Sequence, residues 1–220
     1  MMQPWSQQFI QEAIRCDALR FGEFTLKSGR QSPYFFNAGQ FSSGRSMRVL
    51  SHCYRQALQA SGVGYDMLFG PAYKGIPLAT ALACAIAEEE QRNVPFAYDR
   101  KEAKQHGEGG MLVGAPIDGK VIIIDDVISA GTSARYSAEA IAQAGGQVSA
   151  LLVALDRQER GQSSHATAAK ELQQSGIPVI AIATLGDVID YLDAHQSESK
   201  NLDSTLHKAV AQYQQTWGTT

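Results

Sequence analysis

The chain has few of the residues that mark several specialised protein classes. It contains only three cysteines, at positions 16, 53 and 84, and their spacing matches no metal site. An odd number of cysteines without a disulfide framework is typical of proteins from a reducing compartment. Cys16 and Cys84 lie in apolar helical patterns, so we expect them to be buried thiols, whereas the pattern around Cys53 decides nothing.

The sequence also lacks a long apolar run and an excess of positive charge. No stretch is apolar over a membrane-spanning length, and the amphipathic N-terminus differs from a secretory signal. The net charge of −3 argues against a broad surface for nucleic acid or anionic membranes. An anionic ligand must therefore be held by local basic residues. We expect a soluble, cytoplasmic protein that binds neither nucleic acid nor a membrane.

The composition favours a folded core in one domain. Hydrophobic residues make up 44% of the chain and charged residues 19%, which excludes a disordered protein. A length of 220 residues suits a single domain over residues 1–220. We find no internal repeat and no low-complexity linker.

Apolar runs of strand length alternate with helical patterns along most of the chain. Strands are expected at residues 67–69, 96–98, 121–124, 148–155 and 179–183, and helices at 6–18, 46–60, 76–90, 133–144, 166–174, 187–195 and 202–213. This alternation indicates an α/β fold, a parallel sheet with helices on both faces. Two further strands, at 21–27 and 33–37, do not fit the alternation. They predict a small flap that belongs, with the first helix, to residues 1–40.

The most informative segment runs from residue 121 to residue 133. Four β-branched residues, typical of a buried parallel strand, precede Asp125 and Asp126. A loop of small and hydroxyl residues follows, and then a helix starts. The unpaired amides of such a loop and helix N-terminus favour an anion, and two carboxylates can accept hydrogen bonds from a vicinal diol. The segment therefore predicts a phosphate site beside a sugar-binding pair of acids.

This segment also has two simpler interpretations. One is an ordinary strand–helix unit with an acidic strand end, since small hydroxyl loops alone are common. The other is a Walker-type nucleotide site, which is disfavoured because no Gly-Lys-Ser or Gly-Lys-Thr closes the loop.

Other chemically suggestive stretches also follow strands, and ligands of open α/β sheets bind at the carboxyl ends of the strands. Residues 70–75 join a strand to a helix, so a pyrophosphate could bind their amides and Lys74. Residues 99–110 hold four basic residues, counting His106, and three glycines, as expected for a mobile lid. Taken alone, each stretch is explained more simply, residues 70–75 by a plain helix start and residues 99–110 by a solvated charged loop.

Two weaker signals concern the recognition of a flat, anionic base. Lys27 lies close to Phe35 and Phe36, which point to opposite faces of their strand, so that one ring can face a base while the other packs inward. Arg157 ends another strand and can offer a bidentate fork to a carboxylate. The alternatives are a purely hydrophobic flap and an ion pair between Arg157 and Asp156 or Glu159.

Taken together, these stretches resemble the orotate phosphoribosyltransferases, in their bacterial form, within the type I phosphoribosyltransferases. The resemblance extends from the first helix through the strand at 179–183. Its specific parts are residues 26–29, 32–37, 70–75, 100–107 and the segment 121–133. Ser129 stands where many members have threonine, and it retains the hydroxyl.

The resemblance implies a reaction, a cofactor and an assembly. The reaction transfers ribose 5-phosphate from 5-phosphoribosyl-1-pyrophosphate (PRPP) to orotate, giving orotidine 5′-monophosphate and pyrophosphate, a step of pyrimidine (UMP) biosynthesis. Mg²⁺ would be held through PRPP, without a direct protein ligand. A homodimer would place the lid of one subunit over the site of the other. The family also has a non-proline cis peptide bond in the pyrophosphate loop, here before Tyr73.

The resemblance also assigns site residues. The residues expected to bind PRPP are Lys27, Tyr73, Lys74, Arg100, Lys101, Lys104, His106, Asp125, Asp126, Val127, Ile128, Ser129, Ala130, Gly131, Thr132 and Ser133. Those expected to bind orotate are Phe35, Phe36, Ser129 and Arg157. The expected catalytic residues are Lys101, Lys104, His106, Asp125 and Asp126.

Two alternative functions remain open at the level of sequence. One is a phosphoribosyltransferase for a purine or for uracil. The other is a non-catalytic regulator that senses PRPP, which should lack the lid residues and usually carries a nucleic-acid-binding segment. This chain has the lid residues and no basic appendage.

Overall fold

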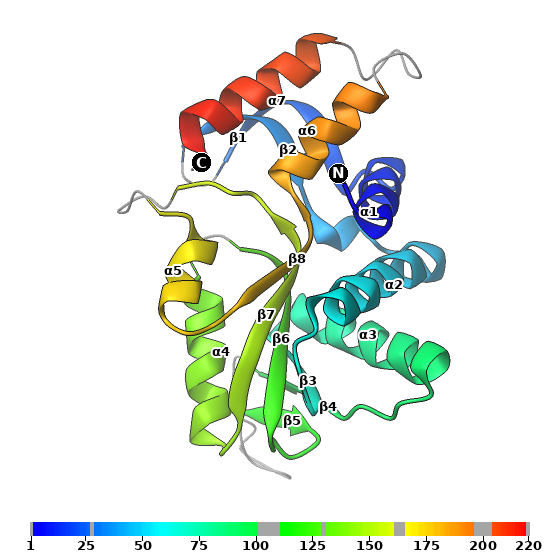
Figure 1. The fold of residues 1–220 in the computed structure, drawn as a ribbon, viewed down its shortest axis with the longest axis vertical. Coiled ribbons are helices and arrows are strands. Elements are labelled where there is room, and N and C mark those ends of the chain that lie inside the picture. The colour runs from blue at the N-terminus through cyan, green and yellow to red at the C-terminus, as the bar shows by residue number, and fades with distance from the viewer. Residues whose placement is uncertain are drawn as a thin grey trace.

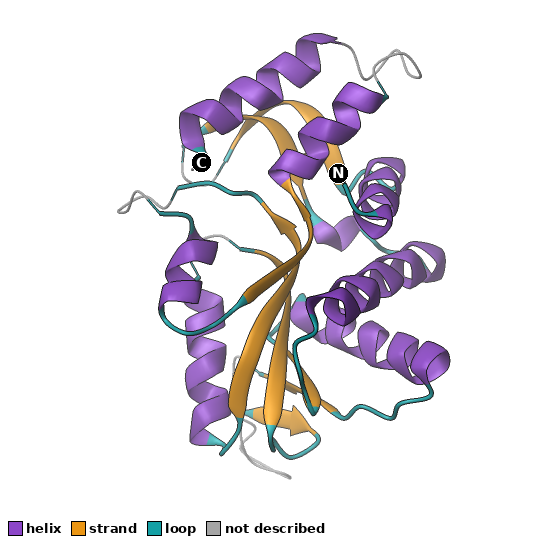
Figure 2. Ribbon diagram, in the orientation of Figure 1, coloured by secondary structure: helices purple, strands orange, loops and turns teal. Residues whose placement is uncertain are grey.

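A twisted six-stranded sheet runs through the middle of the molecule (Figures 1 and 2). The computed structural model describes residues 2–26, 29–100, 111–128, 131–160, 166–195 and 204–218. The strand order is β5-β4-β3-β6-β7-β8, and all neighbours pair in parallel except β5, which is antiparallel to β4. The strands are β3 (Met67–Gly70), β4 (Phe96–Asp99), β5 (Leu112–Gly114), β6 (Lys120–Val127), β7 (Gln147–Asp156) and β8 (Val179–Thr184).

Helices cover both faces of this sheet (Figure 2). On one face lie α1 (Pro4–Arg15), α2 (Gly44–Ser61) and α3 (Gly75–Glu90), and on the other α4 (Thr132–Gln143) and α5 (Ala168–Gln174). Two more helices, α6 (Leu185–Ala194) and α7 (Ser204–Trp217), pack on each other beyond the end of β8. A short 3₁₀ helix, η1 (Ala38–Gln40), leads into α2.

The sheet separates two hydrophobic cores, and the strands supply side chains to them alternately. Ile122 and Ile124 of β6 face the core under α2 and α3, whereas Val121 and Ile123 face the core under α4 and α5. All four side chains are fully buried. Successive side chains of a strand point to opposite faces, so a strand covered on both sides must be apolar at every position. The run of β-branched residues in the sequence has this cause.

An antiparallel hairpin, β1 (Leu19–Thr25) and β2 (Gln31–Phe36), lies outside the sheet and beneath α7 (Figure 1). The backbone N–H of Leu26 donates to the carbonyl of Arg30 at 2.9 Å and helps to close the hairpin. The ring of Phe36 packs on Phe9 of α1 at a centroid distance of 5.9 Å. The hairpin is thus tied both to the N-terminal helix and to the C-terminal one.

The predicted α/β fold with its N-terminal flap is confirmed, and β5 is an addition to it. The sequence predicts a loop at residues 99–110 but no strand after it, because the three residues of β5 are too few to show a periodicity. Asp99 itself is the last residue of β4 and is buried. The antiparallel pairing of β5 makes the sheet mixed rather than purely parallel.

The prediction for Cys84 was wrong, because this side chain is exposed, whereas Cys53 is buried and Cys16 is half-buried. Helix α3 is rich in alanine around its whole circumference, so its apolar pattern does not mark which face is covered. Among the described residues, no helix combines the length and the apolar character that crossing a membrane requires.

Candidate active site

The stretches that carry chemistry in the sequence lie at the carboxyl edge of the sheet. Strands β3, β6 and β7 are direct neighbours, and they end at Gly70, Val127 and Asp156. Strand β4, on the other side of β3, ends at Asp99. The loops that leave these ends are therefore neighbours as well. This is the edge at which ligands bind in open α/β folds.

The two consecutive acids at the end of β6 connect two of these loops. The Oδ2 atom of Asp126 lies 2.5 Å from Nζ of Lys74, and its Oδ1 accepts a 3.0 Å hydrogen bond from the amide of Val127. Oδ1 of Asp125 accepts from the amide of Asp126 at 2.8 Å, and Oδ2 accepts from the hydroxyl of Ser133 at 3.4 Å. One acid therefore contacts the loop 70–75, and the other contacts the first turn of α4.

Asp125 has an unusual electrostatic environment. Burial, and then the negative charge of Asp126, raise the pKa of its carboxyl to about 7. The backbone carbonyl of Asp125 accepts a 2.7 Å hydrogen bond from the hydroxyl of Tyr54, a fully buried residue of α2. This bond fixes the strand end from the side of the helix layer. Perturbed acids of this kind are common at functional sites.

The loop 70–75 approaches its surroundings closely at both ends. A Cβ atom on Gly70 would lie 2.3 Å from the carbonyl oxygen of Gly75, and one on Gly75 would lie 2.7 Å from the carbonyl oxygen of Ile124. The two glycines let the loop pack against itself and against β6. Between them, the peptide bond from Ala72 to Tyr73 is cis, as the resemblance implied.

A carboxylate of the neighbouring strand also holds this loop. The amide of Ala72 donates to Oδ1 of Asp99 at 2.5 Å, and Asp99 is buried. Arg100 follows directly, and its amide donates to the carbonyl of Met111 at 2.8 Å. The loop 70–75 and the start of the predicted lid are therefore joined through adjacent residues of one strand end.

The first turn of α4 is arranged to receive an anion. Gly131 precedes the helix in the left-handed conformation, with φ of 70°, and it offers no side chain to cap the helix. The hydroxyls of Thr132 and Ser133 follow on the exposed side. An uncapped helix N-terminus presents free amides and the positive end of the helix dipole. The neighbouring Ile128 is buried, so it can offer a ligand little more than its backbone.

The hairpin meets the end of β7 at Arg157. The Nε atom of Arg157 donates to the hydroxyl of Tyr34 at 3.1 Å, and Nη2 lies 2.6 Å from Oε1 of Glu159. The ion pair with Glu159, which was the simpler interpretation of this arginine, is thus present. Arg157 nevertheless lies beside the hairpin strand that carries Phe35 and Phe36.

The two phenylalanines point to opposite faces of β2, as alternation along a strand requires. Phe36 packs on Phe9 of α1, whereas the ring of Phe35 lies 5.6 Å from that of Phe24. The guanidinium of Arg20 covers the same ring at 5.6 Å from its centroid. Phe36 is therefore the ring that packs inward, and Phe35 occupies the other face.

Several predicted site residues fall outside the described part of the chain. These are Lys27, Lys101, Lys104, His106, Ser129 and Ala130. Of the predicted residues that are described, the structure brings together Lys74, Asp125, Asp126 and Ser133 through direct contacts. Tyr73 lies in the same loop as Lys74 and is largely exposed.

Three residues near this site are not predicted as site residues by the sequence. Asp99 could have been recognised, because it ends a strand at the ligand-binding edge. Tyr54 gave no signal, because it lies in an ordinary amphipathic helix, and Glu159 was expected only as a possible ion-pair partner of Arg157. Their positions depend on tertiary contacts between elements far apart in the sequence.

Comparison with known proteins agrees with this arrangement. Residues 44–198 match the family described as the phosphoribosyl transferase domain. The orotate phosphoribosyltransferase of Saccharophagus degradans is 52% identical over 217 residues, which cover 99% of each chain. That of Chromobacterium violaceum is 55% identical over 203 residues, which cover 92% of this chain and 94% of the relative.

A solved structure extends the agreement to three dimensions. The crystal structure of orotate phosphoribosyltransferase from Francisella tularensis matches with a TM-score of 0.84 and 40% identity, over 96% of this chain and 99% of the other. The family match, the full-length relatives and the fold lead to one conclusion. The chain belongs to the orotate phosphoribosyltransferase family, with the type I phosphoribosyltransferase fold.

Proposed function

We propose that the protein transfers the ribose 5-phosphate group of PRPP to orotate, releasing pyrophosphate and forming orotidine 5′-monophosphate for pyrimidine synthesis. The observation that carries this proposal is the pair of contacts from Asp125 to Ser133 and from Asp126 to Lys74. It supports a site in which two acids that would bind a sugar lie between a helix start that would bind an anion and a cation. PRPP needs these three features in this order, since its ribose separates a phosphate from a pyrophosphate.

The 5′-phosphate of PRPP would bind the loop and helix start at residues 129–133. The carboxylates of Asp125 and Asp126 would accept hydrogen bonds from the ribose hydroxyls. Lys74 would neutralise the pyrophosphate on the amides of the loop 70–75. Each assignment follows from the chemistry of the groups and from their order along the sheet edge.

The reaction breaks the bond between C1′ and the pyrophosphate oxygen and forms a bond from C1′ to a ring nitrogen of orotate. The sugar becomes oxocarbenium-like in the transition state, as in other glycosyl transfers. The electron pair of the broken bond stays with pyrophosphate, where Lys74 can stabilise the charge that develops. The ring nitrogen of orotate is itself ionisable, so the reaction does not require a dedicated protein base. A carboxylate at Asp125 or Asp126 would also favour the positive sugar.

The residues present fit a magnesium ion that is held mainly by the substrate. Asp125 and Asp126 offer hard oxygen ligands at this edge, but they already accept hydrogen bonds from Lys74, Ser133 and the backbone. Within the described ranges, no three His, Cys, Asp or Glu side chains gather around one point. Mg²⁺ would therefore be held through PRPP rather than by these carboxylates, and would supply positive charge for the pyrophosphate.

The predicted lid would complete the site. Arg100, Lys101, Lys104 and His106 would add positive charge over the pyrophosphate, and closure would exclude water from the reacting sugar. We propose that the protein is a homodimer in which this lid acts on the neighbouring subunit. Phe35, Phe36 and Arg157 would hold orotate, with Arg157 directed at its carboxylate.

The proposal is tested by mixing the purified protein with PRPP, Mg²⁺ and orotate while following orotate absorbance and pyrophosphate release. We expect turnover that needs all three components. Activity with uracil or a purine, and none with orotate, would support the PRPP site and reject the assigned base. PRPP binding without turnover of any base would reject catalysis in favour of a PRPP-sensing regulator.

A further inference from the structure

Helix α7 bears no residue of the proposed PRPP site, yet it is tied to the segment that follows Arg157. The backbone amide of Arg160 donates to the carbonyl of Trp217 at 2.8 Å, and Nη2 of the same arginine donates to the carbonyl of Thr216 at 2.8 Å. The side chain of Gln214 donates to Oε1 of Gln158 at 3.2 Å. The last two turns of α7 therefore hold residues 158–160 in place.

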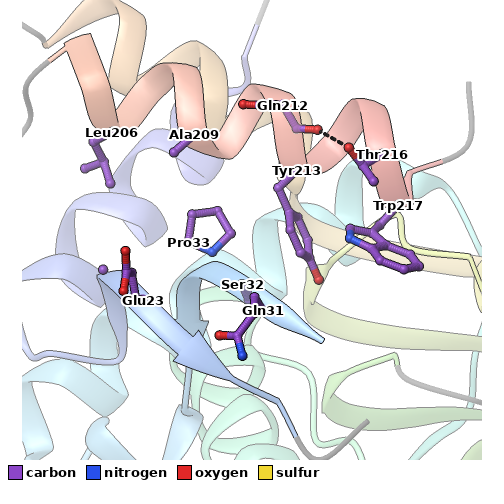
Figure 3. A pocket seen from close by; sticks show the side chains of 11 residues that line it. Glu23, Gln31, Ser32, Pro33, Leu206, Ala209, Gln212, Tyr213, Thr216 and Trp217 are labelled. Atoms are coloured by element: carbon purple, nitrogen blue, oxygen red, sulfur yellow. Dashed lines mark hydrogen bonds between the residues drawn. The ribbon is translucent and has the colours of Figure 1, made fainter. Parts of the chain in front are cut away.

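These hydrogen bonds are made by the C-terminal half of α7. A cavity of about 710 Å³ lies between α7 and the hairpin (Figure 3). Leu206 and Ala209 line it from the N-terminal half of the helix, opposite Glu23 and Pro33. Tyr213 extends from α7 toward the hairpin at one side of this cavity. Its ring packs edge-on against that of Tyr34 in the hairpin, at a centroid distance of 5.8 Å.

Glu159 is the point at which three parts of the chain meet. Its Oε1 accepts hydrogen bonds from the hydroxyls of Tyr34 at 3.1 Å and Tyr213 at 3.0 Å, and it lies 2.6 Å from Nη2 of Arg157. Its Oε2 lies 3.6 Å from Nη1 of Arg30. The carboxylate is thus held by the hairpin, by α7 and by the end of β7, with only 14% of its side chain exposed.

Arg157 is oriented by the same groups. Its Nε donates to the hydroxyl of Tyr34, and its guanidinium lies 5.2 Å from the centre of the Tyr34 ring. Nη2 is buried close to Glu159, but it is not directed at an acceptor among the described residues well enough to form a hydrogen bond. The guanidinium is held along one edge while it retains donors for another carboxylate.

The described side chains in ionic contact with Glu159 are both arginines. Glu159 lies between two arginines, Arg30 and Arg157, so these three side chains together carry one net positive charge. Burial makes such a charge costly unless an anion accompanies it. A carboxylate on the substrate would supply that anion.

We propose that α7 positions Arg157 for the carboxylate of the base, acting through the hydroxyl of Tyr213 and the carboxylate of Glu159. The inference rests on the proposed transfer to orotate, and it assigns a role to the C-terminal helix. Tyr213 and Glu159 are positioning residues, since they touch Arg157 or its partner and not the reacting atoms. Loss of either contact should loosen the guanidinium and weaken the binding of the base alone.

The test compares the KM for orotate with the KM for PRPP in Tyr213→Phe and Glu159→Gln. We expect the KM for orotate to rise about threefold in Tyr213→Phe and about tenfold in Glu159→Gln, with kcat little changed, because uniform binding is lost. The KM for PRPP should stay within about twofold in both variants. Tyr65→Phe, which removes a hydroxyl before the start of β3, is the matched control and should change neither KM.

A double variant separates positioning from a general structural effect. Because Tyr213 acts through Glu159, Tyr213→Phe in the Glu159→Gln background should raise the KM for orotate no further. Equal rises in both KM values, or effects that multiply in the double variant, would overturn the proposal. If Glu159→Gln fails to fold, the proposal is tested by the ratio of the KM for orotate to the KM for PRPP in Tyr213→Phe alone. An unchanged ratio would overturn it. Absence of orotate turnover in the unmodified protein would instead reject the proposed function.

Discussion

The Nζ atom of Lys74 lies 2.5 Å from Oδ2 of Asp126, although the lysine side chain is half exposed and the aspartate is buried. The pair joins the loop after β3 to the end of β6, the two strand ends between which the proposed substrate lies. In the proposed reaction, Lys74 exchanges part of this contact for the pyrophosphate, whose charge grows as the C1′–O bond breaks.

Replacing Lys74 with glutamine should therefore damage catalysis and leave stability almost unchanged. We expect kcat/KM for PRPP to fall about a hundredfold, as when a preorganised charge-stabilising donor is removed. The free energy of unfolding should change by less than about 1 kcal/mol, because one partner of the pair is well solvated. Steady-state kinetics and thermal unfolding check the two parts. A large loss of stability with normal kinetics would mean that the pair is structural.

Asp125 should make the protein less stable as the pH rises toward neutrality. Its pKa is about 7 in the folded protein, against an ordinary value of 3.8, so the folded state binds more protons between these values. The free energy of unfolding therefore falls as the pH rises through this window. Above pH 7 it stays lower by the full cost of ionising Asp125 in the folded protein. Asp125→Asn should remove that cost.

We expect Asp125→Asn to raise the melting temperature at pH 8 by about 3 °C or more, and to have no such effect near pH 4. Its activity should nevertheless be strongly reduced, because the carboxylate is proposed to bind the ribose hydroxyls. Asp17→Asn makes the same chemical change at an exposed position and should behave like the unmodified protein at both pH values. An equal effect of Asp125→Asn at pH 4 and pH 8 would contradict the raised pKa.

Gly75 and Gly44 form a matched pair, because each is the first residue of a helix. A Cβ on Gly75 would meet backbone atoms of Ile124 and Gly70 at less than 3 Å, whereas one on Gly44 would meet nothing within 4 Å. Gly75→Ala should therefore lower the free energy of unfolding by about 2 kcal/mol, and Gly44→Ala should leave it nearly unchanged. Chemical denaturation of both variants measures these free energies of unfolding. Equal stability of the two variants would show that the loop 70–75 accommodates the added methyl group without cost.

The predicted lid can be tested by mixing two inactive proteins. If the lid acts on the neighbouring subunit, Lys101→Ala and an Asp125→Asn/Asp126→Asn variant should regain partial activity when mixed dimers form. Each mixed dimer would then hold one site with an intact lid and intact acids. Mass spectrometry verifies the mixed dimers, and absence of activity in them would place the lid over its own site.

Lys101→Ala also has an expected kinetic signature by itself. Its proposed partner, the pyrophosphate charge, develops late, so kcat should fall far more than the affinity for PRPP. Turnover and PRPP binding, measured on the same preparation, give the two quantities. Equal losses in both would mean that Lys101 binds the ground state as strongly as the transition state.

The sequence was sufficient for features whose cause is local. The run Val121–Ile124 predicted a doubly covered strand, and Asp125 and Asp126 followed at its end, because burial on both faces leaves a direct trace in residue type. The exposure of Cys84 left no such trace in an alanine-rich helix. The bond from Tyr213 to Glu159 joins residues 54 positions apart in ordinary polar surroundings, so the tertiary structure was needed to find it.

The pairing of β5 with β4 has a consequence for engineering. Residues 100 and 111 are joined by a backbone hydrogen bond, and the antiparallel ladder continues from them into the sheet. The two ends of the intervening segment are thus fixed side by side by contacts that do not involve it. A variant that alters the length of the predicted lid should therefore leave the register of β4 and β5 unchanged, and its effect should appear in catalysis rather than in the sheet.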